Sequence, residues 1–203
     1  MLDFKTLVLQ ISIFEGFRAN KYLDAVGVPT IGYGFTASCF DNEQVPDTIS
    51  RGVADDMLEK ILLQYKQIVS QYLDSCPYLT QIQRSALLLP LTDFTYNCGY
   101  ANLRKLTDYG NRNYKEICDK IVLYNKAGGK VLKGLQVRRD WELKEIKKAY
   151  KELSTTTATP TEKIYNIKDV QTALNKLGYN LAVDGIAGKA TCKAIITELN
   201  ARR

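Results

Sequence analysis

The sequence contains no histidine. Without histidine, the chain cannot build a Ser-His-Asp or Cys-His nucleophile system, and it lacks the imidazole ligands of most zinc-dependent hydrolases. Any hydrolytic chemistry must therefore rest on carboxylates, hydroxyls, lysine or tyrosine. We accordingly expect neither a metal site nor a cofactor.

Cysteine is also scarce. The five cysteines are an odd number, and no two of them form a Cys-x-x-Cys pair. This spacing does not predict a zinc or thiol-disulfide motif, so reduced thiols in the core or on the surface are expected. The cysteines are Cys39, Cys76, Cys98, Cys118 and Cys192.

Long apolar runs are missing, since none approaches the ~18 residues that a membrane-spanning helix needs. The first apolar stretch is interrupted by Gln10, Ser12 and Glu15, and no small-residue cleavage site follows it. This pattern is typical of an amphipathic helix and not of a signal peptide. We expect no stable membrane insertion, and any export must follow a route outside the chain's own sequence.

What is present is typical of a soluble globular protein: 203 residues, 45% hydrophobic and 25% charged, enough for one ordinary domain and a small one. The net charge of +6 is uneven, at −4 for residues 1–60, +7 for 61–153 and +3 for 154–203. The basic regions suit an anionic polymer. Nucleic acid and the bacterial envelope both qualify, and charge alone does not choose between them.

Helical spacing dominates the pattern. Apolar residues at positions 4, 7, 8, 11 and 14 predict a first helix, with Asp3 as its N-cap and Gly16 as its end. Residues 22–36 combine β-formers with glycine and proline, which predicts a small antiparallel sheet. Further helices are expected at 50–73, at 79–94 with a kink or restart at Pro90, and at 100–107, 113–125 and 135–152.

A small, polar, proline-bearing segment follows these helices. It predicts a linker, and we divide the chain into a domain at 1–153, a linker at 154–163 and a second domain at 164–203. The last part holds two short helical patterns, at 167–177 and 189–199.

Two carboxylates near the N-terminus stand out. Glu15 lies between Phe14 and Phe17, and apolar surroundings raise the pKa of a carboxyl group. Asp24 lies in a predicted turn, where accepted hydrogen bonds would keep it ionised. Two carboxyl groups of unequal proton affinity are typical of glycoside hydrolysis, although the bare spacing alone favours a solvated surface.

Glu15, Asp24 and Thr30, followed by Gly32-Tyr33-Gly34, closely resemble the phage-type muramidases of glycoside hydrolase family 24. The resemblance implies an α+β, mainly helical, lysozyme-like domain, with a small antiparallel sheet lobe facing a helical lobe across a cleft. It implies that protonated Glu15 donates to the glycosidic oxygen, while Asp24 and Thr30 hold the attacking water. Inversion would then require carboxyl groups ~6.5–9.5 Å apart.

Residues 93–99 resemble the family segment that lines the sugar cleft, which implies substrate contacts by Phe94 and Asn97, together with Gly32 and Tyr33. The alternative is a helix end capped by Gly99.

Residues 127–139 lack the spacing of a phosphate-binding loop and resemble instead the family segment before the last helix of the domain. Arg138 and Arg139 are expected to pair with acids of the N-terminal lobe or to cap helices, with wall contact as the alternative. Phe35 stands where family members commonly have histidine, and we expect it to pack apolarly.

Residues 169–178 and 183–191 resemble peptidoglycan-binding modules of the three-helix type, although Ala187 replaces a usual aromatic residue. The alternative is a helical packing unit or a DNA-binding one.

The resemblance as a whole implies a monomeric endolysin that acts on bacterial peptidoglycan, does not bind nucleic acid, and reaches the wall through a holin-made lesion. The rival interpretations are a lytic transglycosylase, a wall-binding or virion protein without activity, and a secreted antibacterial effector.

Overall fold

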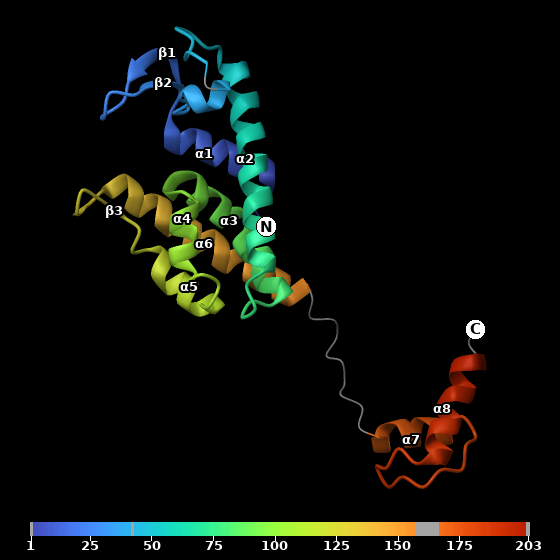
Figure 1. The fold of residues 1–203 in the computed structure, drawn as a ribbon. Coiled ribbons are helices and arrows are strands. Elements are labelled where there is room, and N and C mark those ends of the chain that lie inside the picture. The colour runs from blue at the N-terminus through green and yellow to red at the C-terminus, as the bar shows by residue number, and fades with distance from the viewer. Residues whose placement is uncertain (1, 42, 157–166, 202–203) are drawn as a thin grey trace. The chain divides into compact units, whose positions relative to one another are not determined.

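The protein is described here by a computed structural model, which covers residues 2–41, 43–156 and 167–201 (Figure 1). The chain forms two compact units, residues 1–156 and residues 157–203. Each unit has its own architecture. The predicted linker residues 157–163 and the first residues of the second domain, 164–166, lie outside the described residues.

The first unit begins with a small lobe that contains the predicted sheet. Helix α1 leads into strands β1 and β2, which pair antiparallel with Arg18 opposite Gly32 and Leu23 opposite Pro29. A short 3₁₀-helix then leads to the long helix α2. The bounds are α1 Phe4–Glu15, β1 Arg18–Leu23, β2 Pro29–Gly32, η1 Ala37–Phe40 and α2 Arg51–Asp74.

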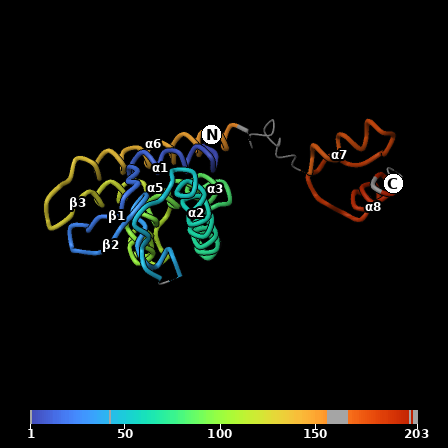
Figure 2. The backbone as a smooth tube through the Cα atoms, turned by 90° about the horizontal axis from the view of Figure 1, so that it is seen from above, coloured from blue at the N-terminus to red at the C-terminus, as the bar shows by residue number. Residues whose placement is uncertain are grey.

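The second lobe of this unit is helical. Helix α3 packs against both α2 and α6, and the shorter helices α4 and α5 lie beside them (Figure 1, Figure 2). The bounds are α3 Gln81–Cys98, α4 Tyr100–Leu106, α5 Tyr114–Ile121, β3 Lys126–Ala127, β4 Lys130–Val131 and α6 Lys133–Thr156.

Each lobe has a separate hydrophobic core, and α2 contributes to both. Its first half buries Leu58 and Leu62 against α1 and the sheet. Its second half buries Val69 and Leu73 against α3, α4 and α5. The lysozyme-like arrangement of a small sheet lobe and a helical lobe is therefore confirmed, and Glu15 ends the helix that leads into the sheet.

Polar side chains cap the first two helices as the sequence predicts. The Asp3 carboxylate accepts a hydrogen bond from the Thr6 backbone N–H at 2.7 Å, and Ser50 accepts one from Val53 at 3.3 Å. These bonds satisfy N–H groups that the first turn of a helix leaves without partners. Helix α1 ends at Gly16, whose φ of +71° a residue with a Cβ would adopt only under strain.

Helix α3 runs through Pro90 without the restart that was one of the two predicted outcomes, because its packing against α2 and α6 holds the turn that a proline weakens. Two local features differ from the sequence-based prediction. Helix α6 continues through Ser154–Thr156, residues that the sequence assigns to the linker. A hairpin, β3–β4, turns through Gly128 and Gly129, both at positive φ.

The second unit contains two helices within residues 167–201, α7 (Ile167–Lys176) and α8 (Lys189–Ala201). The buried side chain of Gln171 organises the loop between them. Its amide nitrogen donates to Asp184 at 2.8 Å and to the Ile186 carbonyl at 3.0 Å, and its oxygen accepts from the Gly185 N–H at 2.9 Å. One fully bonded amide therefore fixes the predicted Asp-Gly turn.

Across the described ranges, none of the helices combines the length and the apolar character that crossing a membrane requires.

Candidate active site

Glu15 is the last residue of α1, and aromatic packing fixes the backbone on both sides of it. The ring of Phe14 packs edge-on against Trp141 with ring centroids 5.6 Å apart, and Phe17 packs at the same distance against Tyr33. The two phenylalanines thus hold the end of the helix, and they do not enclose the carboxylate.

The Glu15 carboxylate has a charged partner in addition to the apolar side chains that line its pocket. Its side chain is 23% exposed, and Oε1 accepts a hydrogen bond from Nη1 of Arg138 at 2.7 Å. Arg138 comes from α6, 123 positions further along the chain, so the sequence around Glu15 gives no indication of this partner. The ion pair with Arg138 therefore holds the carboxylate in place.

Arg138 is itself held by a second acid. Its Nη2 lies 2.6 Å from Oδ1 of Asp93, and its Nε also donates to both oxygens of that carboxylate, at 3.2 and 3.1 Å. Asp93 is fully buried and Arg138 is 4% exposed. Helices α1, α3 and α6 therefore meet in one ion-pair network, and the expectation that Arg138 pairs with an acid of the N-terminal lobe is confirmed.

Asp24 lies at the β1–β2 turn with its carboxylate anchored by backbone groups. Its Oδ1 accepts hydrogen bonds from the N–H groups of Val26 at 2.9 Å and Val28 at 2.8 Å. Both bonds end on the same oxygen, so they orient the carboxylate. Gly27, at a φ of +85°, allows the chain to reverse here.

Thr30 and Asp24 both bind the backbone of Val28. Its hydroxyl donates to the Val28 carbonyl at 2.9 Å, while the Val28 N–H is the group that binds Asp24. Because that hydroxyl donates its one hydrogen bond to the Val28 carbonyl, its oxygen keeps lone pairs for accepting a further hydrogen bond. The turn thus brings these two side chains together, although Thr30 is only 3% exposed.

A pocket of about 650 Å³ opens beside Glu15. Glu15, Asn97 and Arg138 line it together with Lys133 and the apolar side chain of Leu132 at the start of α6. Asp24 and Thr30 are not among its lining residues. The structure therefore groups the predicted residues into two pairs, Glu15 with Asn97 and Asp24 with Thr30.

Phe94 is a correction to the predicted substrate contacts. Its ring is fully buried, packs on Tyr124 at 5.0 Å and lies under the Arg139 guanidinium, so no surface remains for a sugar. The segment is helical, as predicted, but Phe94 lies on the face of the helix that points into the core and not toward a substrate. Asn97, one turn further on, reaches the pocket and accepts from Arg139 at 3.2 Å.

Tyr33 is also mostly buried, at 2% exposure, and its hydroxyl donates to Asp55 at 2.5 Å. Burial and then the Asp55 carboxylate raise the pKa of the Tyr33 phenol, so it remains protonated. Tyr33 borders a pocket lined also by Lys5 and Arg51, distinct from the one that holds Glu15. The structure thus places its ring in the core of the small lobe.

Gly32 and Phe35 pack against each other. Gly32 has a φ of +65°, and a Cβ built on it would lie 2.7 Å from the Phe35 ring. Phe35 is 1% exposed and meets Tyr33 edge-on at 6.1 Å. Phe35 therefore packs apolarly, as expected from its identity, and Gly32 leaves room for its ring.

The sequence interpretation missed the burial of Arg139 and Glu142. Both are fully buried in α6, where Nη2 of Arg139 lies 2.5 Å from Oε1 of Glu142. The indication was available, because positions 138, 139, 142, 146 and 149 form one helical stripe that faces the core. Charged residues at core positions of such a stripe predict a buried polar network.

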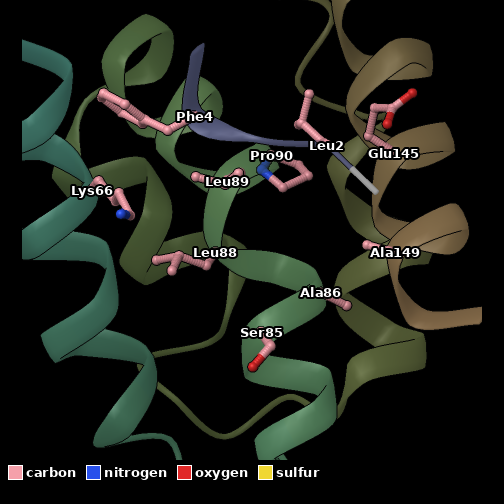
Figure 3. Close-up of a pocket in the computed structure, with 10 residues that line it drawn as sticks. All are labelled: Leu2, Phe4, Lys66, Ser85, Ala86, Leu88, Leu89, Pro90, Glu145 and Ala149. Atoms are coloured by element: carbon pink, nitrogen blue, oxygen red, sulfur yellow. The ribbon is translucent and has the colours of Figure 1, made fainter. Parts of the chain in front are cut away.

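A third pocket, of about 240 Å³, lies among α2, α3, α6 and the N-terminal segment (Figure 3). It is mostly apolar, with Leu2, Leu89 and Pro90 in its wall and Lys66 and Glu145 as its charged residues (Figure 3). None of the predicted site residues lines it.

Within the described ranges, no group of three or more potential ligand side chains could hold a metal ion.

Comparison with known proteins gives a match to a family model described as phage lysozyme, over residues 12–142. A SAR-endolysin of Bacteriophage PS119 is 32% identical over 132 residues, which are 63% of this chain and 73% of that relative. An endolysin of Bacillus phage B103 is 32% identical over 145 residues, 65% of this chain and 49% of the relative, so the chain spans about half its length.

Among solved structures, the chain is similar to the muramidase domain of SpmX from Asticaccaulis excentricus. The TM-score is 0.52 at 25% identity, and the alignment covers 70% of this chain and 95% of that one. The match to the family model lies within the first unit.

Proposed function

Because this chain belongs to the phage lysozyme family and is a peptidoglycan-hydrolysing enzyme, we propose that Glu15, Asp24 and Thr30 carry out its reaction. The bond broken is the β-1,4 glycosidic bond between N-acetylmuramic acid and N-acetylglucosamine, with inversion, as in glycoside hydrolase family 24. The observation that carries this proposal is the Glu15 carboxyl group, which lines an open pocket and is held there by Arg138.

Glu15 acts as the general acid. Its proton passes to the glycosidic oxygen as the bond to the anomeric carbon breaks, and the bonding electrons leave with the sugar alcohol. Glu15 then carries a full negative charge 2.7 Å from the Arg138 guanidinium. A fixed positive charge at this point stabilises the carboxylate as it forms.

Asp24 and Thr30 act on the attacking water. The two N–H bonds to Oδ1 of Asp24 fix the carboxylate, and Thr30 is fixed through the backbone carbonyl of Val28, the residue whose N–H binds Asp24. The water gives a proton to Asp24 while its oxygen bonds to the anomeric carbon from the face opposite the leaving group. Thr30 accepts a hydrogen bond from that water, and Asn97 contacts the sugar in the pocket beside Glu15.

The second unit is proposed to bind the wall. Support comes from its resemblance to three-helix peptidoglycan-binding modules, from the loop fixed by Gln171, and from the exposed side chains of Val183 and Ile186. A tethered binding module raises the local concentration of wall polymer around the catalytic unit. The proposal includes a monomeric enzyme with no nucleic-acid partner, released to the wall through a holin-made lesion.

The proposed reaction is tested by its products. Purified peptidoglycan is digested, and the released muropeptides are analysed by mass spectrometry and by proton NMR at early times. Hydrolysis with inversion predicts reducing N-acetylmuramic acid that forms first as the α anomer. Early β anomer would show retention and contradict the role of Asp24.

Two rivals predict other products. A lytic transglycosylase, which needs only one glutamate, forms 1,6-anhydro sugars that are lighter by one water. The fixed pair of Asp24 and Thr30 favours hydrolysis, because that pair would be unnecessary for the anhydro product. A wall-binding protein without activity would bind the polymer and release no fragments.

A further inference from the structure

A buried cluster of four charged residues lies behind Glu15, and the proposed reaction does not use all of it. We define the buried charge cluster as Asp93, Arg138, Arg139 and Glu142, each of which is at most 4% exposed. Arg138 links the cluster to Glu15. A change of charge inside this cluster therefore changes the electrostatic environment of the proposed general acid.

The two oxygens of Glu142 have different surroundings. Oε1 accepts from Arg139 at 2.5 Å, whereas Oε2 is buried and meets no hydrogen-bond donor among the described residues. A buried carboxylate oxygen without a donor costs free energy. A proton on Oε2 would turn this oxygen into a donor, and the Asp93 side chain is the hydrogen-bond partner that raises the pKa of Glu142.

Once Glu15 has given its proton to the leaving group, the charges of the cluster and Glu15 together do not balance unless one further proton is present. Two guanidinium groups face three carboxyl groups, those of Asp93, Glu142 and Glu15. If all were ionised, a buried site would carry a net negative charge, and two of its carboxylates would repel each other at close range. One shared proton removes both penalties, as in pairs of carboxyl groups elsewhere.

The groups that face Glu142 come from each helix packed around it. Asp93 comes from α3, and Arg138 and Arg139 come from α6 itself. Beyond them, Glu15 of α1 lies on Arg138, and the thiol of Cys98 on α3 accepts from Arg139 at 2.8 Å. Burial first, and the Asp93 charge next, raise the pKa of Glu142 well above its usual range.

We propose that Asp93 and Glu142 share one proton at neutral pH, and that this proton keeps the positive charge of Arg138 available to Glu15. Without it, Asp93 and Glu142 would together cancel both guanidinium charges. Arg138 would then stabilise the Glu15 carboxylate less when Glu15 gives its proton to the leaving group. Glu142 is thus a positioning residue that acts through Asp93 and Arg138. This role rests on the proposed function of Glu15, but the shared proton itself does not.

The shared proton has a thermodynamic signature. A folded state that binds one more proton than the unfolded state loses stability as the pH rises, by a tenfold change in the unfolding equilibrium constant per pH unit. This loss of stability begins near the pKa of an exposed glutamate. Above that pH, only the folded protein keeps this proton. Replacement of Glu142 by glutamine retains a donor toward Asp93 and removes the titration.

The first experiment therefore measures the unfolding equilibrium of the wild type and the Glu142→Gln variant of the full chain from about pH 5 to about pH 8. The variant should gain stability relative to the wild type as the pH rises, approaching tenfold per unit. If Glu142 is instead an ionised partner of Arg139, the variant leaves a buried cation unpaired and is less stable at every pH, with no relative gain. That result would overturn the proposal.

A direct readout uses the inactive Glu15→Gln background, in which Glu15 cannot contribute a carboxyl signal. Infrared spectra at neutral pH should show the carbonyl band of a protonated carboxylic acid. The band should vanish in the Glu15→Gln/Glu142→Gln double variant. Its absence from the Glu15→Gln spectrum would contradict the shared proton, whatever the catalytic role of Glu15.

The link to Glu15 is tested by the alkaline limb of the pH–rate profile on peptidoglycan. In Glu142→Gln the limb should remain where it is in the wild type, whatever the maximal rate, because the net charge behind Arg138 is unchanged. In Asp93→Asn/Glu142→Gln the cluster gains a positive charge, and the limb should move to lower pH. A shift already present in Glu142→Gln alone would overturn the proposal.

Discussion

Arg138 is the residue on which the geometry of the proposed acid depends. It donates to Glu15 with one nitrogen and to Asp93 with two others. A change in any of these three side chains therefore alters the hydrogen bonding of the other two. A planar guanidinium can hold two carboxylates at fixed angles, which a lysine ammonium cannot do. The orientation of Glu15 is therefore set from α6 and α3, not from its own helix.

Gly32 is a second single residue with a defined role, because two features of its surroundings exclude a larger side chain. Its φ is positive, and the Phe35 ring would lie only 2.7 Å from a Cβ at this position. Gly32→Ala should lower the free energy of unfolding by about 2–4 kcal/mol, measured by denaturant titration.

The matched control for this prediction is Gly27→Ala. Gly27 also has a positive φ, but a Cβ there would meet no atom within 4 Å. It should therefore cost only the backbone strain, about 1–2 kcal/mol. Equal losses in the two variants would show that the contact with Phe35 does not constrain this position.

Single residues also show where sequence information ends. The helix end at Glu15 follows from local spacing and Gly16, so the position of this carboxyl group was predictable. Its partner was not, because no local rule connects residues 15, 93 and 138. The motif assigns Phe94 to the cleft, but a helix has several faces, and only packing decides that Phe94 points into the core.

At the scale of elements, caps and periodicity predict the long helices well. Helix α2 begins after Ser50 and ends at Asp74, close to the predicted bounds. The β3–β4 hairpin was missed because strands of two residues carry too little pattern to recognise. The sequence left open a kink or a restart at Pro90, and α3 continues through it because tertiary packing outweighs the lost hydrogen bond.

The N-cap of α1 gives a pH prediction. The hydrogen bond from the Thr6 backbone N–H lowers the pKa of Asp3 below its ordinary value of 3.8. A lowered carboxyl pKa stabilises the fold above the unfolded-state pKa, and this contribution is lost as the pH falls through the folded-state pKa. Asp3→Ala should therefore lower the Tm more at about pH 7 than at about pH 2.5.

Ser50→Ala is the control for this comparison. Ser50 caps α2 through a hydroxyl that does not titrate, so its loss should lower the Tm by a similar amount at both pH values. If the two variants show the same pH dependence, the charge of Asp3 does not contribute to the cap.

At the scale of the whole molecule, residues 1–156 contain both hydrophobic core clusters of the first unit and every residue proposed for the reaction. A chain that ends after Thr156 keeps α6 complete and should fold by itself. It should cleave soluble glycan strands at a rate close to that of the full chain. Its apparent affinity for sedimented wall should fall by about 10²-fold or more.

Co-sedimentation and a soluble-substrate assay on the same preparations check both halves of this prediction. If the shortened chain keeps its affinity for the wall, the second unit is not responsible for wall binding. A lost rate on soluble glycan would instead show that the first unit does not work alone.

The measurement that tests the central claim most directly compares wild type and Glu15→Gln in a turbidity assay on purified peptidoglycan. Glutamine can still accept the hydrogen bond from Arg138 but has no proton to give to the leaving sugar. The account predicts a lytic rate lower by about 10²–10⁴-fold, with unchanged binding to the wall and a Tm within a few degrees of the wild type. A correctly folded Glu15→Gln protein that clears the wall at the wild-type rate would contradict it.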